Sequence, residues 1–238
     1  MLPAFSLIIP AYNEAHRIGH TLVEALSYLA AASSGSEIVV VDDGSTDATA
    51  EVVRDVFKSA GAIESRLIQQ TPNRGKGAAV RAGLRAASRS IALFSDADLS
   101  TPIEEAPKLI EPISVGQADV AFGSRALDRT LIGTRQSWGR EQGGRVFKLL
   151  VRVSTGLPFW DTQCGFKAFK LDAFQPVLAK AHSDGFGFDV ELLYLAHRAG
   201  LRMQEIPVRW NHCEGSKVHF VHDSLHMLQE VIAMRMRR

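Results

Sequence analysis

The chain has 238 residues, 27 basic and 26 acidic side chains for a formal net charge of +1, and 46% hydrophobic residues. This composition is typical of a globular protein, and the near-zero charge gives no electrostatic argument for nucleic-acid binding. Two cysteines, Cys164 and Cys213, are too few for a disulfide framework and too far apart for a local metal site, which favours a reducing compartment. No signal-peptide pattern and no run of about 18–20 apolar residues is present, so we expect neither export nor a membrane span.

Short apolar runs rich in β-branched residues alternate with amphipathic segments. The runs predict strands at 5–9, 37–41, 66–68, 91–94 and 120–123, and the amphipathic segments predict helices at 14–32, 46–60 and 77–87. The first helix carries one apolar stripe made of Ile18, Leu22, Ala25, Leu26 and Leu29. This alternation predicts an α/β fold with a Rossmann-like, mostly parallel sheet flanked by helices, and ligands of such folds bind beyond the carboxyl ends of the strands.

Acidic residues follow three of the predicted strands. Glu14 comes after the first, Asp42 and Asp43 after the second, and Asp96 and Asp98 after the fourth. Asp42 and Asp43 have an equally good interpretation as helix caps. Asp96 and Asp98 lie two positions apart on an extended segment, so their carboxylates point the same way and repel each other unless a cation lies between them. A divalent ion completed by substrate phosphates is typical of such a pair.

Taken together, these motifs resemble the family 2 glycosyltransferases, which have the GT-A fold. The first-half motifs are IIPAYNE (8–14), VDDGSTD (41–47), GKG (75–77) and DAD (96–98). GSR (123–125), DTQCGFK (161–167) and the segment from Trp210 to GSK (215–217) resemble the branch that transfers a hexose to a polyprenyl phosphate. The resemblance covers nearly the whole chain. It implies a nucleotide-sugar donor, an inverting transfer and a lipid-phosphate acceptor such as dolichyl or undecaprenyl phosphate.

The resemblance also assigns the donor and metal residues. Asp96 and Asp98 would bind Mg²⁺ or Mn²⁺ against the donor diphosphate, and the donor-binding residues would be Pro10, Tyr12, Glu14, Asp43, Lys76 and Ala97. Lys76 has an alternative interpretation, because the glycines around it can simply turn the chain into a helix. Ser100 stands where many mannose-transferring relatives have Gln, which leaves a third protein ligand in question. The 161–167 segment is closer to glucosyl-transferring relatives, which favours UDP-glucose over GDP-mannose.

An acceptor that is a phosphate monoester needs no general base, because it is mostly dianionic at neutral pH. The site should therefore supply cations, and we expect Arg125 and Arg140 to bind the acceptor phosphate, with Arg135 as the alternative to Arg140. Lys217 would close over the donor diphosphate. Asp161 would orient the acceptor or act as a base, or would merely cap the turn before Gly165.

The segment 143–159 mixes apolar residues with cations and predicts an interfacial helix that binds the membrane surface. Its alternative is an ordinary helix packed on the sheet. We expect one GT-A domain, with residues 1–124 binding the nucleotide sugar and residues 125–238 the acceptor, on the cytoplasmic face of a membrane. Relatives with membrane anchors are known in this branch, and this sequence shows none.

Three other functions are alternatives to this interpretation of the sequence. A phosphoacceptor signalling domain is about half this length and leaves Asp96, Asp161 and Lys217 unexplained. A nucleotide-sugar pyrophosphorylase normally has a Gly-rich loop after its first strand, where this chain has Pro10, Ala11 and Tyr12. A family 2 glycosyltransferase acting on a soluble or polysaccharide acceptor is the main alternative.

Overall fold

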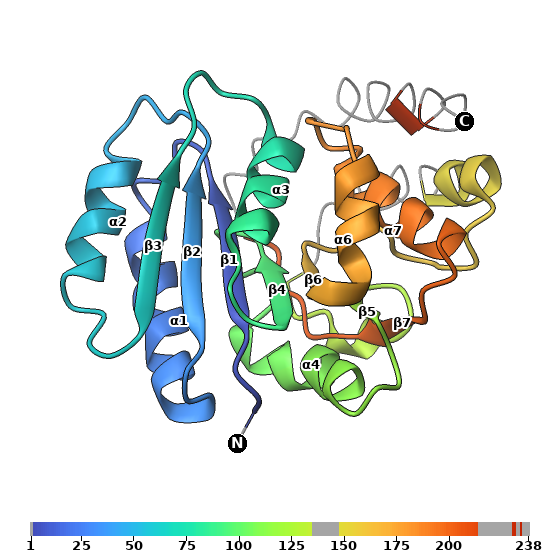
Figure 1. Cartoon of the computed structure of the whole chain (residues 1–238), viewed down its shortest axis with the longest axis horizontal. Coiled ribbons are helices and arrows are strands. Elements are labelled where there is room, and N and C mark those ends of the chain that lie inside the picture. The colour runs from blue at the N-terminus through green and yellow to red at the C-terminus, as the bar shows by residue number, and fades with distance from the viewer. Residues whose placement is uncertain (1, 135–147, 214–229, 232–233, 235–238) are drawn as a thin grey trace.

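The computed structural model describes residues 2–134, 148–213, 230, 231 and 234, and in them seven strands form one sheet (Figure 1). The order across the sheet is β3-β2-β1-β4-β6-β5-β7. Neighbouring strands are parallel except at β6, which is antiparallel to both β4 and β5. The strands are β1 (Ser6–Ala11), β2 (Glu37–Asp42), β3 (Glu64–Gln69), β4 (Ile91–Ser95), β5 (Val120–Ser124), β6 (Phe166–Lys170) and β7 (Met203–Pro207).

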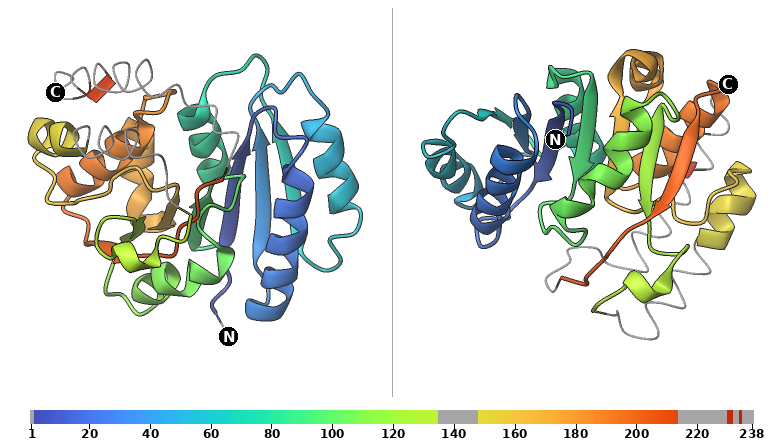
Figure 2. Two further views of the ribbon diagram at one scale, coloured as in Figure 1. Left: turned by 180° about the vertical axis from the view of Figure 1, so that it is seen from behind. Right: turned by 90° about the horizontal axis from the view of Figure 1, so that it is seen from below.

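Helices cover both faces of the sheet, as the views from behind and below show (Figure 2). Apolar residues of α1, α2 and α4 pack on one face, and those of α3, α6 and α7 pack on the other. The helices are α1 (Ile18–Ala32), α2 (Thr49–Phe57), α3 (Lys76–Ala86), α4 (Ala106–Ser114), α6 (Leu171–Lys180) and α7 (Phe188–Arg198), with two short 3-10 turns at Ile103–Glu105 and Arg129–Leu131. Residues 148–155 are also helical.

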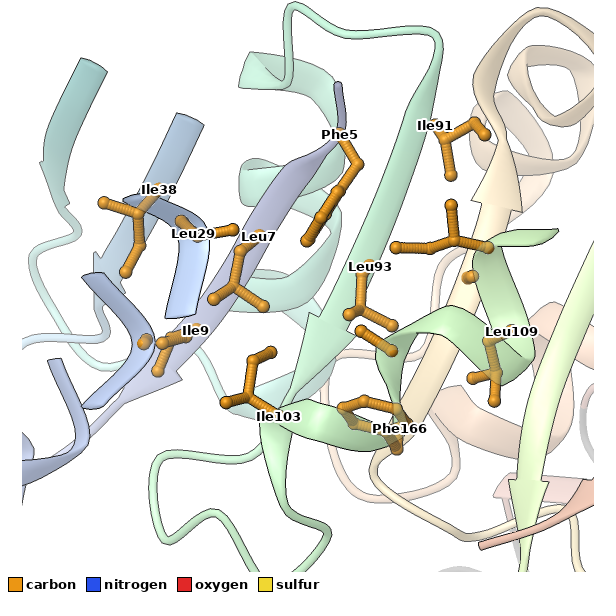
Figure 3. Packing of buried hydrophobic residues seen from close by; sticks show 14 of the residues in the cluster. Phe5, Leu7, Ile9, Leu29, Ile38, Ile91, Leu93, Ile103, Leu109 and Phe166 are labelled. Carbon is orange, nitrogen blue, oxygen red and sulfur yellow. The ribbon is translucent and has the colours of Figure 1, made fainter. Parts of the chain in front are cut away.

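The central strands are buried on both faces, which explains their continuous apolar sequences. Along β1, Leu7 and Ile9 point toward α1 and α4, whereas Ile8 points toward α3. Figure 3 shows the first of these two layers, in which Leu7 and Ile9 lie near Leu29 and Ile103. Successive strand residues face opposite sides, so each central strand contributes to two cores at once.

The predicted architecture is confirmed, with shifts at the ends of elements. Each of the five predicted strands is present, and the predicted apolar stripe of the first helix is buried in α1. That helix begins at Ile18 rather than at residue 14, because Asn13 has a positive φ of 53° and a turn separates it from α1. Neither Asp42 nor Asp43 caps α2, which begins at Thr49, because the Thr49 backbone N–H donates to Asp47 instead.

Candidate active site

The chemistry-bearing segments meet at one edge of the sheet. The parallel strands β1, β2, β4, β5 and β7 end at this edge and the antiparallel β6 begins there, because its partners run the other way. Loops that are more than 100 residues apart in sequence therefore lie next to one another. The structure brings together the predicted residues from 10–14, 42–43, 76, 96–98, 125 and 161 at this edge.

The loops after β1 and β2 are joined by side-chain hydrogen bonds. The Asn13 N–H donates to Oγ of Ser45 at 2.8 Å, and Oδ1 of Asn13 accepts from the N–H of Thr46 at 2.8 Å. Glu14 pairs with Arg17 at 2.7 Å, while Tyr12 keeps 39% of its surface exposed beside them. These bonds fix the loop backbone, and the exposed part of the Tyr12 ring is accessible to a flat ligand group such as a nucleoside base.

Asp43 fixes the start of α3. Its two carboxylate oxygens accept hydrogen bonds from the backbone N–H groups of Arg74 and Gly75, at 2.9 and 2.7 Å. Burial raises the pKa of Asp43, and the two backbone donors offset part of that effect. Each carboxylate oxygen has a second lone pair, so Asp43 can still accept from a ligand hydroxyl or N–H.

The glycines around Lys76 serve packing. A Cβ at Gly75 or Gly77 would lie 2.4 or 2.3 Å from a backbone carbonyl oxygen of the 183–184 segment. The N–H groups of Gly77 and Ala78 already donate to the carbonyl of Asp184. The first turn of α3 is therefore capped by protein, and the part of this motif that reaches the site is the Lys76 side chain.

Asp96 and Asp98, here called the acidic pair, follow β4. Nζ of Lys76 lies 2.7 Å from Oδ1 of Asp96, and Oδ1 of Asp98 accepts from the N–H of Ser100 at 2.9 Å. Burial alone would lower the pKa of Lys76, but the neighbouring carboxylates outweigh it and raise that pKa. A Cβ at Gly165 would lie 2.0 Å from Oδ2 of Asp96, so only glycine leaves room for this carboxylate.

The acidic pair fits a divalent ion. Mg²⁺ and Mn²⁺ prefer oxygen ligands and are commonly held by one or two carboxylates together with substrate phosphates. The Asp96 side chain is 30% exposed and is therefore accessible to such an ion. No group of three or more His, Cys, Asp or Glu residues suited to a metal occurs in the described part of the chain. The remaining ligands would come from substrate oxygens or water.

A buried ion pair lies next to the acidic pair. Lys167 is fully buried and donates to Asp189 of α7 and to the carbonyl of Cys164, whose chain neighbour is Gly165. Burial raises the pKa of Asp189, against the effect of Lys167 and Lys76. This pair joins the 161–167 segment to α7 and so helps to hold Gly165 in its place beside Asp96.

On the other side of the site, Asp161 binds two cations. Its carboxylate accepts from Nε and Nη2 of Arg125, at 2.7 and 2.8 Å, and Oδ2 lies 3.0 Å from Nζ of Lys148. Burial alone would raise the pKa of Asp161, but the charges of Arg125 and Lys148 outweigh it and hold that pKa well below its usual range. The carboxylate binds these side chains rather than capping the turn before Gly165.

Two further groups hold this cluster in place. The Arg125 guanidinium lies over the Trp210 ring, 5.5 Å from its centroid, where a cation–π interaction stabilises it. Glu205 of β7 accepts hydrogen bonds from Oγ of Ser124 and from the N–H groups of Trp160 and Asp161, at 2.7, 2.9 and 2.8 Å. The backbone beside Asp161 is thereby tied to the end of β5.

Of the predicted interfacial helix at 143–159, the structure describes residues 148–159, and of these residues 148–155 are helical. Leu149, Leu150 and Val153 are 58%, 45% and 72% exposed, and Trp160 just beyond is 55% exposed. Phe159, predicted to end the helix, instead follows it in irregular structure and packs edge-on against Phe122, with ring centroids 5.0 Å apart.

Several predicted residues lie outside the described part of the chain: Arg135, Arg140, Lys217 and residues 143–147. Near the C-terminus, residues 230, 231 and 234 are described, and Val231 and Met234 are buried with Val151 and Val190. No helix in the described residues has the length and apolarity needed to cross a bilayer.

The sequence interpretation missed Lys148, Asp189 and Glu205 as parts of the site. Lys148 is one of the cations of the segment 143–159, which the sequence predicts to bind the membrane surface. Its spacing of three from Val151, an apolar residue that is 2% exposed, is the available signal that it faces inward. Asp189 and Glu205 have no local signal, because each becomes part of the site only through a partner more than 20 residues away.

Comparison with known proteins agrees with this geometry. The family model described as glycosyl transferase family 2 matches residues 6–178. Proteins named dolichyl-phosphate beta-glucosyltransferase are similar over most of the chain. The protein from Drosophila melanogaster is 39% identical over 90% of this chain and 68% of its own length. The protein from Saccharomyces cerevisiae is 35% identical over 97% and 74%, and that from Homo sapiens is 35% identical over 98% and 75%.

Solved structures with the same fold include glucosyl-3-phosphoglycerate synthase from Mycobacterium tuberculosis. Its complex with phosphoglyceric acid has a TM-score of 0.66 and 22% identity, covering 97% of this chain and 78% of that one. Its complex with Mn²⁺, uridine diphosphate and glucosyl-3-phosphoglycerate has a TM-score of 0.65 and 21% identity, with 98% and 78% coverage. At these identities the likeness is one of fold.

Proposed function

The chain belongs to glycosyl transferase family 2, and from this membership we propose that it moves a hexose from a nucleoside-diphosphate sugar to a polyprenyl phosphate, inverting the anomeric centre. Glucose is the favoured sugar and dolichyl phosphate the model acceptor, as in the name of the relatives that share up to 39% identity, and UDP-glucose is the favoured donor. Mannose from GDP-mannose and undecaprenyl phosphate are the other members of the same chemical classes.

One observation carries the proposal: the acidic pair and the cations on Asp161 lie at the same edge of the sheet. The first suits a metal and a diphosphate, and the second suits a phosphate on a different molecule. A transfer from a nucleotide sugar to a phosphate acceptor needs both. An acceptor with only a hydroxyl carries no negative charge for these cations to balance.

On the donor side, Asp96 and Asp98 would hold Mg²⁺ or Mn²⁺, which when bound offsets the negative charge on the departing diphosphate. The fold neighbour with Mn²⁺ and uridine diphosphate supports a divalent ion of this kind. Lys76 would contact the diphosphate from its position beside Asp96. Pro10, Tyr12, Glu14, Asp43 and Ala97 would line the base, ribose and phosphate positions, and Lys217 would close over the diphosphate.

On the acceptor side, the phosphate oxygen would attack the anomeric carbon, forming the new C–O bond as the bond to the nucleoside diphosphate breaks. A phosphate dianion needs no proton removed, so no base is required. Asp161 would be a poor base in any case, because its two cations lower the pKa of its carboxyl group and so its affinity for a proton. We assign it a positioning role: it would orient Arg125 toward the acceptor phosphate, with Arg140 as a second arginine.

The exposed apolar side chains of Leu149, Leu150, Val153 and Trp160 would rest on a membrane surface, where the lipid phosphate is found. Arg152 lies over the Trp160 ring, 4.0 Å from its centroid, so a cation accompanies the aromatic ring at this surface. Aromatic and cationic side chains beside apolar ones are typical of interfacial helices. We propose that residues 125–238 form the acceptor-binding part of one GT-A domain, and that the chain binds the cytoplasmic face as a peripheral protein.

The test is a transfer assay with UDP-glucose, GDP-mannose and other UDP-sugars against citronellyl phosphate, a short polyprenyl monophosphate, with Mg²⁺, Mn²⁺ or a chelator. We expect metal-dependent transfer of glucose to the phosphate. D98A should abolish transfer, whereas D55A, which removes an exposed aspartate paired with Lys58, should retain it. Transfer to citronellol or a soluble sugar at the same rate as to citronellyl phosphate would overturn the acceptor assignment in favour of a soluble-acceptor glycosyltransferase.

The membrane proposal has its own test, co-flotation with anionic vesicles at low salt. Replacing Leu149, Leu150 and Val153 with Ser should release the protein from the vesicles without changing donor binding. Val23 and Val115 are equally exposed valines elsewhere, 55% and 67%, and serine at both is the matched control. Equal loss of vesicle binding in the control would refute a specific role for the helix.

A further inference from the structure

We infer that Lys148 is a specificity-determining residue that binds the acceptor phosphate together with Arg125. This inference rests on the proposed function and adds to it a residue from a different segment of the chain. Arg125 and Lys148 are called the cation pair below. The juxtaposition that carries the inference is two cations on the two oxygens of one buried carboxylate, at the edge where the acceptor must approach.

The exposure of the Asp161, Arg125 and Lys148 side chains shows from which side a ligand can reach the cation pair. Asp161 is fully buried, whereas the side chains of Arg125 and Lys148 are 22% and 25% exposed. The carboxylate therefore lies beneath the cations, and both cations keep part of their surface available to an incoming anion. An arrangement built only for stability would have no need to leave both cations accessible.

The charge count points to an anion as the ligand. Two cations and one carboxylate leave a net charge of +1, and among the described residues no other carboxylate lies within ion-pair distance of Arg125 or Lys148. A guanidinium has five N–H donors and an ammonium has three, so Asp161 uses only some of them. A phosphate dianion, with three oxygen acceptors on one centre, matches the remaining donors.

The direction of Lys148 follows from the helix on which it lies. Lys148 and Val151 are three residues apart and so share a face of the helix, and Val151 is 2% exposed against α7. The exposed residues Leu149, Leu150 and Val153 lie on the other side. The same helix therefore presents apolar residues outward and one lysine inward, to the carboxylate that binds Arg125.

The two faces of this helix match the two parts of a lipid-phosphate acceptor, its apolar chain and its phosphate. If the outward face contacts the lipid chain or bilayer, Lys148 on the inward face receives the phosphate of that same lipid. Burial lowers the pKa of Lys148 and Asp161 offsets part of this effect, so an added phosphate would further favour the charged lysine. The cation on the membrane-facing helix then selects acceptors that carry both an apolar chain and a phosphate.

The experiment compares K148A, K148Q and K148R with the wild type, using citronellyl phosphate as acceptor, UDP-glucose as donor and inorganic phosphate as a competing anion. K108A is the matched control, because Lys108 lies 2.6 Å from Glu105, a buried carboxylate that also binds an arginine, Arg209. Thermal unfolding is measured for every variant.

We expect K148A and K148Q to raise the KM for citronellyl phosphate about 10- to 100-fold, the effect of losing one charge-assisted hydrogen bond. The Ki of inorganic phosphate should rise with it, and the KM for UDP-glucose should stay unchanged. K148R should recover part of the acceptor affinity. K108A should lose a similar amount of thermal stability with no change in either KM.

Three results would overturn the inference. An unchanged acceptor KM in K148A, with transfer by the wild type intact, would reduce Lys148 to a structural partner of Asp161 and leave the proposed function standing. Loss of vesicle binding without any change in KM would make it a bilayer contact. Absence of transfer to citronellyl phosphate by the wild type would remove the proposed function and this inference together.

Discussion

Replacing Asp161 with Asn removes one negative charge and leaves the shape of the side chain almost unchanged. The Asp161 side chain is 0% exposed, and its two oxygens bind the cation pair at 2.7 to 3.0 Å. D161N therefore leaves two positive charges facing each other over a neutral amide. The perturbation tests whether this carboxylate positions cations or takes part in proton transfer.

The loss of folding stability expected in D161N follows from the burial of Asp161, Arg125 and Lys148. Removing one partner of a buried ion pair costs about 3–5 kcal/mol, because the other charge is left without compensation. Both cations keep about a quarter of their surface exposed to water, so the lower end of that range, about 3 kcal/mol, applies here. For a chain of this length that corresponds to a fall in Tm of about 6–12 °C.

The folding stability of the wild type and of D161N should each change with pH in a direction that follows from the pKa shifts. The folded pKa of Asp161 lies below its unfolded value of about 3.9, so its stabilising contribution is present above about pH 4 and is lost as the pH falls toward the folded pKa. In D161N, Lys148 loses the charge that supported it, and its already lowered pKa falls further. The unfolded chain then binds more protons at Lys148 than the folded one, so the stability of D161N should rise as the pH increases from neutrality.

The assay is denaturant unfolding of the wild type, D161N and D55N across pH 3 to 9, together with the kinetics of transfer. D55N removes half of an exposed pair whose side chains are 77% and 73% exposed, and it should cost under about 1 kcal/mol. A positioning role predicts lower stability and a higher acceptor KM. D161N of wild-type stability with an unchanged acceptor KM and a kcat reduced by several orders of magnitude would refute this reasoning and make Asp161 the base.

Three further substitutions test the surroundings. G165A places a Cβ 2.0 Å from Oδ2 of Asp96, so it should weaken Mn²⁺-dependent UDP binding in calorimetry by about 5- to 160-fold, the equivalent of about 1–3 kcal/mol of overpacking. D43A should weaken UDP binding by about 1.5–3 kcal/mol, from the loss of a charge-assisted acceptor, and unchanged affinity would move the nucleoside site elsewhere. E205Q replaces an acceptor of three hydrogen bonds by a group that also donates, so the acceptor KM should rise while the donor KM stays constant; an effect on both would contradict a local role.

The sheet and its first helices were predictable because their signals are local. Apolar runs such as that of β2 are complete within six residues, and the stripe from Ile18 to Leu29 repeats with the helical period. The second half was harder for a physical reason. β6 and β7 have charged or partly exposed residues at several positions, as in Phe166–Lys170 and Met203–Pro207, so neither gives a clear apolar run.

The site residues also divide into those that a local motif predicts and those that no local motif predicts. Asp96 and Asp98 are recognisable because both carboxylates lie in one short motif after a buried strand. Lys148 and Glu205 are not, because helical periodicity does not say which of several cations turns inward, and a glutamate in a strand says nothing about a loop 44 residues away. Whether a charged residue is part of the site depends on its partner, and the partners of Lys148 and Glu205 are distant in sequence.

The distribution of charge explains how one sheet edge can hold two charged clusters of opposite sign. Lys76 contacts one member of the acidic pair, which leaves about one negative charge there, and Asp161 compensates one member of the cation pair, which leaves about one positive charge. Each cluster thus carries an internal counter-charge that limits the cost of holding like charges together without substrate. The residual charges differ in sign, so a cation binds at one cluster and an anion at the other. In the proposed reaction, a metal-bound nucleotide sugar and an acceptor phosphate would therefore be directed to different clusters.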